Sequence, residues 1–509
     1  MIRVKSAAQS PNWPLLGLIG LGFALRLYQL DRNSLWFDEI VITFRATLPL
    51  MNGLYSLLGG GMQLLPLEQW ITKAWLVVGN SDWLVRFPPV IFGVLTIPMM
   101  YKLGRSYFAE RVGLFAAVLL TINPFQIWYA QENRSYSLLI LASIGAMYAF
   151  VNLLRHNSRT AFWQLVFFHM LGFNAHYFMF LISTCQFVFL AIHLKRYHRL
   201  LKLWLLSQVI AALMMVPWWY FLLTHSQHTV GTGWIQSPTL LDFWLTFLNF
   251  TIGYQERSSL LLTLATLIVS LAFIIGLITV GRMPARYRLI LIWVWLPIVV
   301  VWILSLGSLS FYVDRYFLII TPALMLILAA GVTSQPNPAI RTSFGLALVL
   351  AMSFGLSQIY FNPAYFTKDD WRSLAHQVSD SAQPGDGLVT CGDSYRLSLD
   401  YYGLGDIFNE QAKAGEVYYV YPGNFDFNAV LANYNRLWVV TTNPRRDQHH
   451  IGYAYPLVLD RTRLPKAEAV WLDQYPPQNL TVAGITTFLY DLEEKPDLNQ
   501  LVQWSCSGE

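Results

Sequence analysis

The sequence predicts a polytopic α-helical membrane protein that carries a small C-terminal extracytoplasmic α/β domain. Two features of composition support the membrane part: 55% of the 509 residues are hydrophobic and only 12% are charged, whereas soluble proteins carry about 25% charged residues. The composition becomes more polar after residue 360. We therefore predict a transmembrane domain over residues 1–360 and a soluble domain over residues 361–509.

Long apolar segments fill most of the predicted transmembrane domain. A helix that crosses a bilayer needs about 20 predominantly apolar residues. About eleven segments approach this length. They fall near 13–30, 84–103, 112–129, 136–154, 161–175, 177–194, 202–223, 258–280, 289–307, 315–332 and 342–360.

Basic residues between alternate apolar segments predict the topology. Because Lys and Arg are enriched in cytoplasmic loops, we expect a cytoplasmic N-terminus and an extracytoplasmic chain after Tyr360. The start of the chain superficially resembles a signal peptide but has no small-residue cleavage site, so we interpret it as a retained first span. The basic groups are Arg3 and Lys5; Lys102, Arg105 and Arg111; Arg155 and Arg159; Lys195, Arg196, Arg199 and Lys202; Arg282, Arg286 and Arg288; and Arg341.

The loops predicted on the outer face hold most of the residues that could carry chemistry. These loops are 31–83, 131–134, 224–257 and 308–315, whereas the span interiors are almost free of ionisable groups. A proton-coupled transporter needs charges near the middle of the membrane, so this distribution favours a catalytic face. Amphipathic stretches at 64–78 and 239–250 are predicted to lie in the membrane interface with their apolar sides toward lipid.

The segment after residue 360 contains signals for both helices and strands. We predict a polar helix over 369–381, a turn at 384–387 and strands over 388–391, 436–441 and 485–490. Three cysteines, Cys185, Cys391 and Cys506, lack metal-ligand spacing. Whether Cys391 pairs with Cys506 is left open.

The stretch Leu35-Trp36-Phe37-Asp38-Glu39 places two carboxylates directly after the first apolar segment. A solvated loop pair that helps to cap the next helix is the simple alternative. The flanking aromatic residues and the position at a membrane surface favour catalysis, because charge there is costly to maintain. We predict Asp38 as a general base, with Glu39 as part of the catalytic pair.

A second acidic site, in Tyr129-Ala130-Gln131-Glu132-Asn133-Arg134, lies in a short turn between two apolar segments. An ordinary hairpin with a surface Glu–Arg pair would be worth under about 1 kcal/mol. Because the turn is very short, we expect Glu132 and Arg134 at membrane level, with Glu132 catalytic. A guanidinium group there suits phosphate, whose oxygens match its planar fork.

Two further residues are candidates for binding a donor phosphate. Arg315 begins the tenth apolar segment, and a purely structural alternative pairs it with Asp314 at the membrane surface. His176 lies at another outer hairpin, where a lone histidine is often structural. A divalent cation, Mg²⁺ or Mn²⁺, held by Asp38 and Glu132 is a further possibility.

These stretches together resemble the membrane-embedded C-class glycosyltransferases that use polyprenyl-phosphate sugars. The similarity is to the superfamily of dolichyl-phosphate-mannose protein mannosyltransferases and aminoarabinose transferases in its bacterial form, and it covers about residues 10–400. The matching stretches are Arg26-Leu27 through Asp38-Glu39, Trp83 to Pro88, Ile127 to Tyr136, His176-Tyr177-Phe178, Trp234-Ile235 with Pro238, Arg315-Tyr316 and Asp370-Trp371-Arg372.

The resemblance implies a sugar donor on an undecaprenyl- or dolichyl-type phosphate and chemistry on the extracytoplasmic side. It also implies that Asp38 is the base toward an acceptor hydroxyl and that Glu132 is the acidic residue of the second hairpin. The chain departs from its relatives at Gln63, where they often have histidine, at Leu65-Pro66-Leu67-Glu68, where many have a Pro-Pro-Leu-Tyr-like stretch, and at Glu132-Asn133-Arg134, where they have Glu-Ala-Arg.

The predicted function is inverting transfer of one sugar to an acceptor hydroxyl on a protein, lipid or polysaccharide. Membrane lipid is an expected partner, and the modest net charge of +5 indicates no nucleic-acid partner. Two alternatives stay open: a flippase or exporter of lipid-linked sugar, and an oligosaccharyl transferase or polymer ligase that moves a whole glycan.

Overall fold

The computed structural model describes residues 12–58, 65–225, 235, 237–254, 259–307, 309–362, 370–382, 386–390, 393–404, 418–419, 436–442, 478–482 and 485–491. Gln63, Trp234, Cys391 and Cys506 lie outside these residues. The chain forms two compact units. The helical unit comprises Met1–Tyr28, Leu57–Glu68 and Arg86–Asn362, and the tail unit comprises Gln29–Ser56, Gln69–Val85 and Pro363–Glu509.

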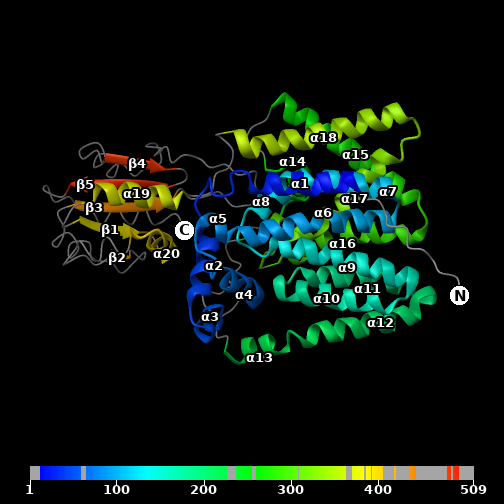
Figure 1. The fold of residues 1–509 in the computed structure, drawn as a ribbon, viewed down its shortest axis with the longest axis horizontal. Coiled ribbons are helices and arrows are strands. Elements are labelled where there is room, and N and C mark those ends of the chain that lie inside the picture. Colours follow the sequence, from blue (N-terminus) through cyan, green and yellow to red (C-terminus); the bar gives the residue numbers. More distant parts are fainter. Residues whose placement is uncertain are drawn as a thin grey trace. The chain divides into compact units, whose positions relative to one another are not determined.

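Helices build the helical unit, and each predicted apolar segment contains one (Figure 1). Helix α9 packs between α6 and α10, and α17 packs on α7 and α15. The main elements are α1 (Trp13–Leu27), α6 (Phe87–Tyr107), α7 (Glu110–Thr121), α8 (Pro124–Ala130), α9 (Tyr136–His156), α10 (Arg159–Ala175), α11 (Met179–Ile192), α12 (Leu194–Leu213), α13 (Val216–His225), α14 (Leu240–Ile252), α15 (Leu260–Arg282), α16 (Arg288–Leu304), η2 (Asp314–Ile320), α17 (Thr321–Thr333) and α18 (Pro338–Phe361).

The apolar helices confirm an integral membrane protein. Among the described residues, six helices are long and apolar enough to cross a membrane, or up to eight if each bent pair of helices is one span. Three shorter apolar helices, α1, α11 and α14, also occur. The number of eleven spans and the topology remain predictions.

A break between α7 and α8 shapes one end of the helical unit. The two helices meet at an angle of 59°. The side chain of Asn123 accepts a hydrogen bond from the amide of Gln126 at 2.8 Å and so caps α8. Arg26 of α1 is fully buried and donates to the carbonyls of Leu120 and Thr121 at the end of α7, both at 3.4 Å. These bonds satisfy backbone groups that the break leaves without helical partners.

Helix α14 places its polar side chains inward, which refines the prediction of an interfacial helix. Leu240 and Leu241 are 79% and 59% exposed, whereas Thr246 and Asn249 are buried. The helix packs on α8, α18 and η2. An apolar outer side is what a helix at a lipid boundary requires, and its polar inner side is available to the interior of the unit.

The tail unit combines short helices from the segment between α1 and α6 with the C-terminal elements. The helices are α2 (Phe37–Thr47), α3 (Leu50–Ser56), α5 (Asp82–Val85), α19 (Trp371–Ser381) and α20 (Asp393–Tyr401), while α4 (Pro66–Trp75) starts in the helical unit and ends in the tail unit. Helix α19 lies in the predicted helical range. The division at residue 360 stays a prediction, but residues 29–56 and 69–85 cluster with the tail.

Five strands form one mixed sheet in the order β2-β1-β3-β5-β4. Strand β1 pairs in parallel with β2 and β3, and β5 pairs antiparallel with β3 and β4. The three predicted strands correspond to β1, β3 and β5. The bounds are β1 (Asp386–Thr390), β2 (Tyr418–Tyr419), β3 (Arg436–Thr442), β4 (Gln478–Val482) and β5 (Ile485–Asp491).

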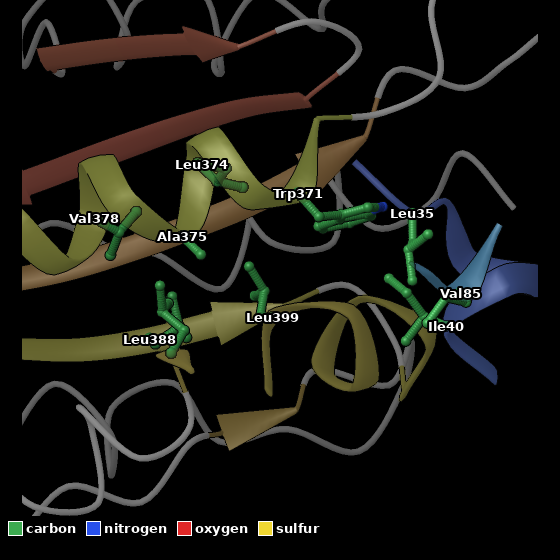
Figure 2. Packing of buried hydrophobic residues seen from close by; sticks show 10 residues of the cluster. Leu35, Ile40, Val85, Trp371, Leu374, Ala375, Val378, Leu388 and Leu399 are labelled. Carbon is green, nitrogen blue, oxygen red and sulfur yellow. The ribbon is translucent and has the colours of Figure 1, made fainter. Parts of the chain in front are cut away.

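One apolar cluster joins the segment between α1 and α6 to the C-terminal helices inside the tail unit (Figure 2). Figure 2 shows the ring of Trp371, at the start of α19, on the side of α19 nearest Leu35 and Ile40. All three residues are at most 1% exposed. Burying a large apolar side chain contributes about 1.5–3 kcal/mol, so this cluster ties residues before and in α2 to a helix more than 300 positions later.

Candidate active site

The turn that carries Glu132 is fixed by bonds within the helical unit. Gln131 donates through Nε2 to the carbonyls of Arg26 and Tyr28 at 3.1 and 2.8 Å, and the amide of Arg134 donates to the carbonyl of Glu132 at 2.7 Å. Glu132 is only 2% exposed. A carboxylate buried at the end of an apolar hairpin is costly, and the catalytic role of Glu132 stays a prediction.

Arg134 lies next to a carboxylate from another element. Its Nε is 3.5 Å from Oε1 of Glu68 at the start of α4, and the two side chains are 13% and 8% exposed. The guanidinium also stands over the ring of Tyr136 at 5.9 Å from the ring centre. The partner of Arg134 is therefore not confined to its own turn, and the exposed hairpin pair that we weighed does not describe it.

His176 links Arg134 to Arg315 through a series of aromatic rings. The ring of His176 lies 6.0 Å from that of Tyr136 and 5.2 Å from that of Tyr316. Arg315 stands over Tyr316 at 5.5 Å from the ring centre. Burial of the imidazole, with the positive charges of Arg134 and Arg315, lowers the pKa of His176 to about 3. His176 is therefore neutral at physiological pH, and the three predicted donor-binding residues lie near one another.

Asp314 has a different role from the one we weighed for it. Its carboxylate accepts hydrogen bonds from Thr246 at 2.9 Å and Asn249 at 2.5 Å, both from the polar side of α14. Thr246 also bonds to the hydroxyl of Tyr312 at 2.9 Å. These bonds fasten α14 to the start of η2, directly beside Arg315.

Tyr254 was not identified from the sequence, although it joins this group. Its hydroxyl lies 3.1 Å from that of Tyr129 on α8. Burial raises the pKa of Tyr254, and the charge of Asp314 raises it further. Tyr254 is therefore a neutral phenol at physiological pH. No sequence signal beyond its place after α14 and Gly253 distinguishes it.

Asp38 and Glu39 belong to the tail unit and have contrasting surroundings. Glu39 is fully buried, and its carboxylate accepts a hydrogen bond from the amide of Trp36 at 3.3 Å, which caps the start of α2. Asp38, the second residue of α2, is partly exposed, and within the described part of the chain its carboxylate has no hydrogen-bond or ion-pair partner. Of the pair, Asp38 is the one available to another molecule.

Metal binding has no clear structural centre in the described chain. Among those residues, no group of three or more His, Cys, Asp or Glu side chains is placed to hold a metal ion. Asp38 lies in the tail unit and Glu132 in the helical unit. The predicted cation therefore stays a prediction.

The comparisons with known proteins agree with the predicted resemblance. The profile of the family described as dolichyl-phosphate-mannose-protein mannosyltransferase matches residues 65–221, which include Glu132, Arg134 and His176. The resemblance to membrane C-class glycosyltransferases is confirmed. The profile covers less than half of the chain, and no curated protein matches.

Solved structures show the same fold at low identity. The structure of ArnT from Cupriavidus metallidurans bound to undecaprenyl phosphate is 10% identical, with a TM-score of 0.58; the match covers 94% of this chain and 98% of that one. The arabinofuranosyltransferase AftD from Mycobacteria is 15% identical, with a TM-score of 0.51; here 96% of this chain and 40% of that one are covered. The ArnT-like arrangement therefore extends over nearly the whole chain.

Proposed function

We propose that this protein is a membrane glycosyltransferase that takes a sugar from a polyprenyl-phosphate donor and transfers it to an acceptor hydroxyl at the extracytoplasmic face. The observation that carries the proposal is the group of Arg134, His176 and Arg315. Two guanidinium groups flank a neutral imidazole at the ends of apolar helices, and two of the three residues lie within the segment that the family profile matches.

The charge of this group suits a lipid phosphate. As the bond between sugar and phosphate breaks, negative charge grows on the phosphate oxygens, and fixed cations stabilise it. Guanidinium groups bind phosphate in a bidentate manner. His176 is neutral and so adds a hydrogen-bonding group rather than a third charge. Binding of undecaprenyl phosphate by the ArnT structure supports this donor class.

Asp38 fits the role of general base. An acceptor hydroxyl is a weak nucleophile, and a carboxylate that accepts its proton as it attacks the anomeric carbon accelerates transfer by about 10²–10⁴-fold. Among the described residues the carboxylate of Asp38 has no hydrogen-bond or ion-pair partner, so it is free to accept that proton. A single displacement inverts the anomeric centre. Glu132, a buried acid in the turn after α8, is assigned a catalytic role.

The proposal fixes a topology. The N-terminus is cytoplasmic, and the C-terminal segment lies outside with the loops that hold Asp38, Glu132 and Arg315. The acceptor is a hydroxyl group of a protein, lipid or polysaccharide.

The test is transfer by the purified full-length protein in liposomes, with polyprenyl phosphates that carry different radiolabelled sugars and with envelope lipids or glycans as acceptors. The proposal predicts a labelled product, release of polyprenyl phosphate and an inverted anomeric configuration. If donor moves between leaflets without breakage of the sugar–phosphate bond, the protein is a flippase. Release of an oligosaccharide but not of a single sugar would indicate a glycan ligase.

A further inference from the structure

The segment Asp31–Trp36, here named the approach loop, leads directly into α2 and Asp38. Several hydrogen bonds reach it from residues far along the chain, all within the tail unit. They come from Trp371 and Arg372 of α19 and from Tyr402, which follows α20.

Arg372 binds the backbone at the start of the approach loop. Its Nη2 donates to the carbonyls of Asp31 and Arg32 at 2.8 and 3.4 Å. Its Nη1 donates to Oδ2 of Asp82, on α5, at 3.0 Å. One planar guanidinium group therefore binds two backbone carbonyls and one carboxylate. The ammonium group of a lysine could make only some of these hydrogen bonds.

Tyr402 binds the other end of the approach loop. The amide of Leu35 donates to its hydroxyl at 2.8 Å, and that hydroxyl donates to the same Oδ2 of Asp82 at 2.8 Å. The hydroxyl is therefore both acceptor and donor. Burial, followed by the charge of Asp82, raises the pKa of Tyr402, so the phenol keeps its proton.

Two further contacts hold the middle of the approach loop. The amide of Trp371 donates to Oγ of Ser34 at 3.0 Å. Leu35 packs into the apolar cluster with Trp371 and with Ile40 of α2 (Figure 2). The loop is thus bound by backbone and side-chain contacts on both sides of Ser34.

Asp38 depends on this loop for its placement. Helix α2 begins at Phe37, and the carbonyl of Trp36 accepts the amides of Glu39 and Ile40 at 2.9 and 3.0 Å. The first turn of α2 therefore follows Trp36. Since no described residue holds the carboxylate of Asp38 directly, its position is set by the backbone alone.

We propose that Arg372 and Tyr402, joined through Asp82, are positioning residues that place Asp38 for proton abstraction. The inference rests on the proposed function, because it needs Asp38 as the base. It gives the C-terminal elements α19 and α20 a part in the reaction, although they contribute no group to the chemistry. Catalytic geometry is sensitive: a displacement of about 1 Å costs up to about 100-fold in rate.

The experiment compares kcat and KM of Tyr402→Phe, Arg372→Gln and Arg372→Lys in the full-length protein in liposomes. Tyr402→Phe removes both hydrogen bonds of the hydroxyl but keeps the ring. Two controls separate positioning from stability. Arg396→Gln removes an exposed ion pair with Asp400 on the same C-terminal segment, and Val378→Ala weakens the same apolar cluster without touching the approach loop.

The proposal predicts that Tyr402→Phe and Arg372→Gln lower kcat by about 10- to 100-fold while KM for the donor changes little, and that Arg372→Lys restores part of kcat. Because both residues act through one loop, the double variant loses little more than the worse single variant. Val378→Ala lowers the melting temperature but keeps the kcat of folded protein, and Arg396→Gln changes neither quantity.

The inference is overturned if Tyr402→Phe and Arg372→Gln keep the kcat of the wild type. It is also overturned if each variant loses no more activity than Val378→Ala does for the same fall in melting temperature. Failure of the proposed function gives a different pattern. In that case wild-type protein transfers no sugar, or Asp38→Asn transfers it as fast as the wild type.

Discussion

Two acidic turns of this protein are built in opposite ways. The turn of Glu132 is held by neighbours in the first third of the chain, Arg26 and Tyr28 through Gln131. The loop before Asp38 is held by residues more than 300 positions later, Arg372 and Tyr402. The Glu132 turn is therefore held by packing among the helices of the helical unit, whereas the loop before Asp38 takes its position only when the C-terminal elements have folded.

This contrast has a consequence for stability. The contacts of Gln131 join residues 105 and 103 positions apart, whereas those of the approach loop join residues 341 and 367 positions apart, and closing the longer loops costs more chain entropy. The approach loop is therefore expected to open with the tail unit, and the Glu132 turn with the helical unit. We therefore expect a perturbation in one unit to leave the acidic turn of the other unit unchanged.

The largest effect is expected from Trp371→Ala. Removing a fully buried tryptophan costs about 3–5 kcal/mol, and we expect hydrogen exchange of the amides in 31–40 to accelerate. The matched variant is Phe150→Ala, which truncates an aromatic residue that is 1% exposed in α9. It should destabilise the helical unit by a similar amount and leave exchange in 31–40 unchanged. If hydrogen exchange in 31–40 accelerated equally in both variants, the loop before Asp38 would not open independently of the helical unit.

Arg315→Gln is expected to remove about 3–4 kcal/mol of transition-state stabilisation, or 10²–10³-fold in kcat, as for a lost oxyanion donor. Arg315→Lys keeps the charge and recovers part of this rate. The control is Arg159→Gln, an exposed arginine at the start of α10. Steady-state transfer assays measure all three, and an Arg315→Gln enzyme with wild-type kcat would remove Arg315 from the donor site.

Asn249→Ala tests the attachment of α14 to η2. It leaves the buried carboxylate of Asp314 with one hydrogen bond fewer, which costs about 1–3 kcal/mol. The melting temperature should fall, and kcat should fall with it because Arg315 adjoins Asp314. Asn174→Ala, which removes only a bond to the carbonyl of Met170 in the same helix, is the control and should change stability less.

The smallest effect concerns His176 and pH. Its pKa is about 3 in the folded protein, against 6.5 for an unperturbed histidine, so the unfolded chain binds an extra proton as pH falls below about 6.5. Between pH 6.5 and pH 5 the free energy of unfolding of the wild type therefore falls by an amount of the order of 1 kcal/mol. The His176→Gln variant does not show this loss. Melting temperatures at pH 7 and pH 5 measure the difference; parallel shifts in the two proteins would mean that His176 is protonated in the folded state.

Sequence patterns predicted the helices better than their connections. Apolar length located a helix in every predicted segment, because a helix that crosses a bilayer needs about 20 apolar residues. Local signals also located α19 and the strands β1, β3 and β5. Arg134, His176 and Arg315 were proposed from their positions at the ends of apolar segments, which are visible in the sequence, and the structure places them near one another; their role in donor binding stays a prediction.

Long-range partners were not predictable. Arg372, Tyr402 and Asp82 meet only because the chain brings α5, α19 and the residues after α20 together, and no spacing in the sequence encodes that meeting. Asp314 was considered as a partner for the adjacent Arg315, yet its hydrogen bonds come from α14. The full burial of Arg26 was not predicted either, since its partners are backbone carbonyls that any sequence possesses.

The central claim is that Asp38 is the base of a sugar transfer from a polyprenyl-phosphate donor. The most direct measurement compares kcat for Asp38→Asn with that for Asp31→Asn, a substitution of an exposed carboxylate seven residues earlier. We expect Asp38→Asn to lose about 10²–10⁴-fold in kcat with unchanged donor binding, and Asp31→Asn to transfer sugar at the wild-type rate. Equal activity of the two variants would contradict the assignment.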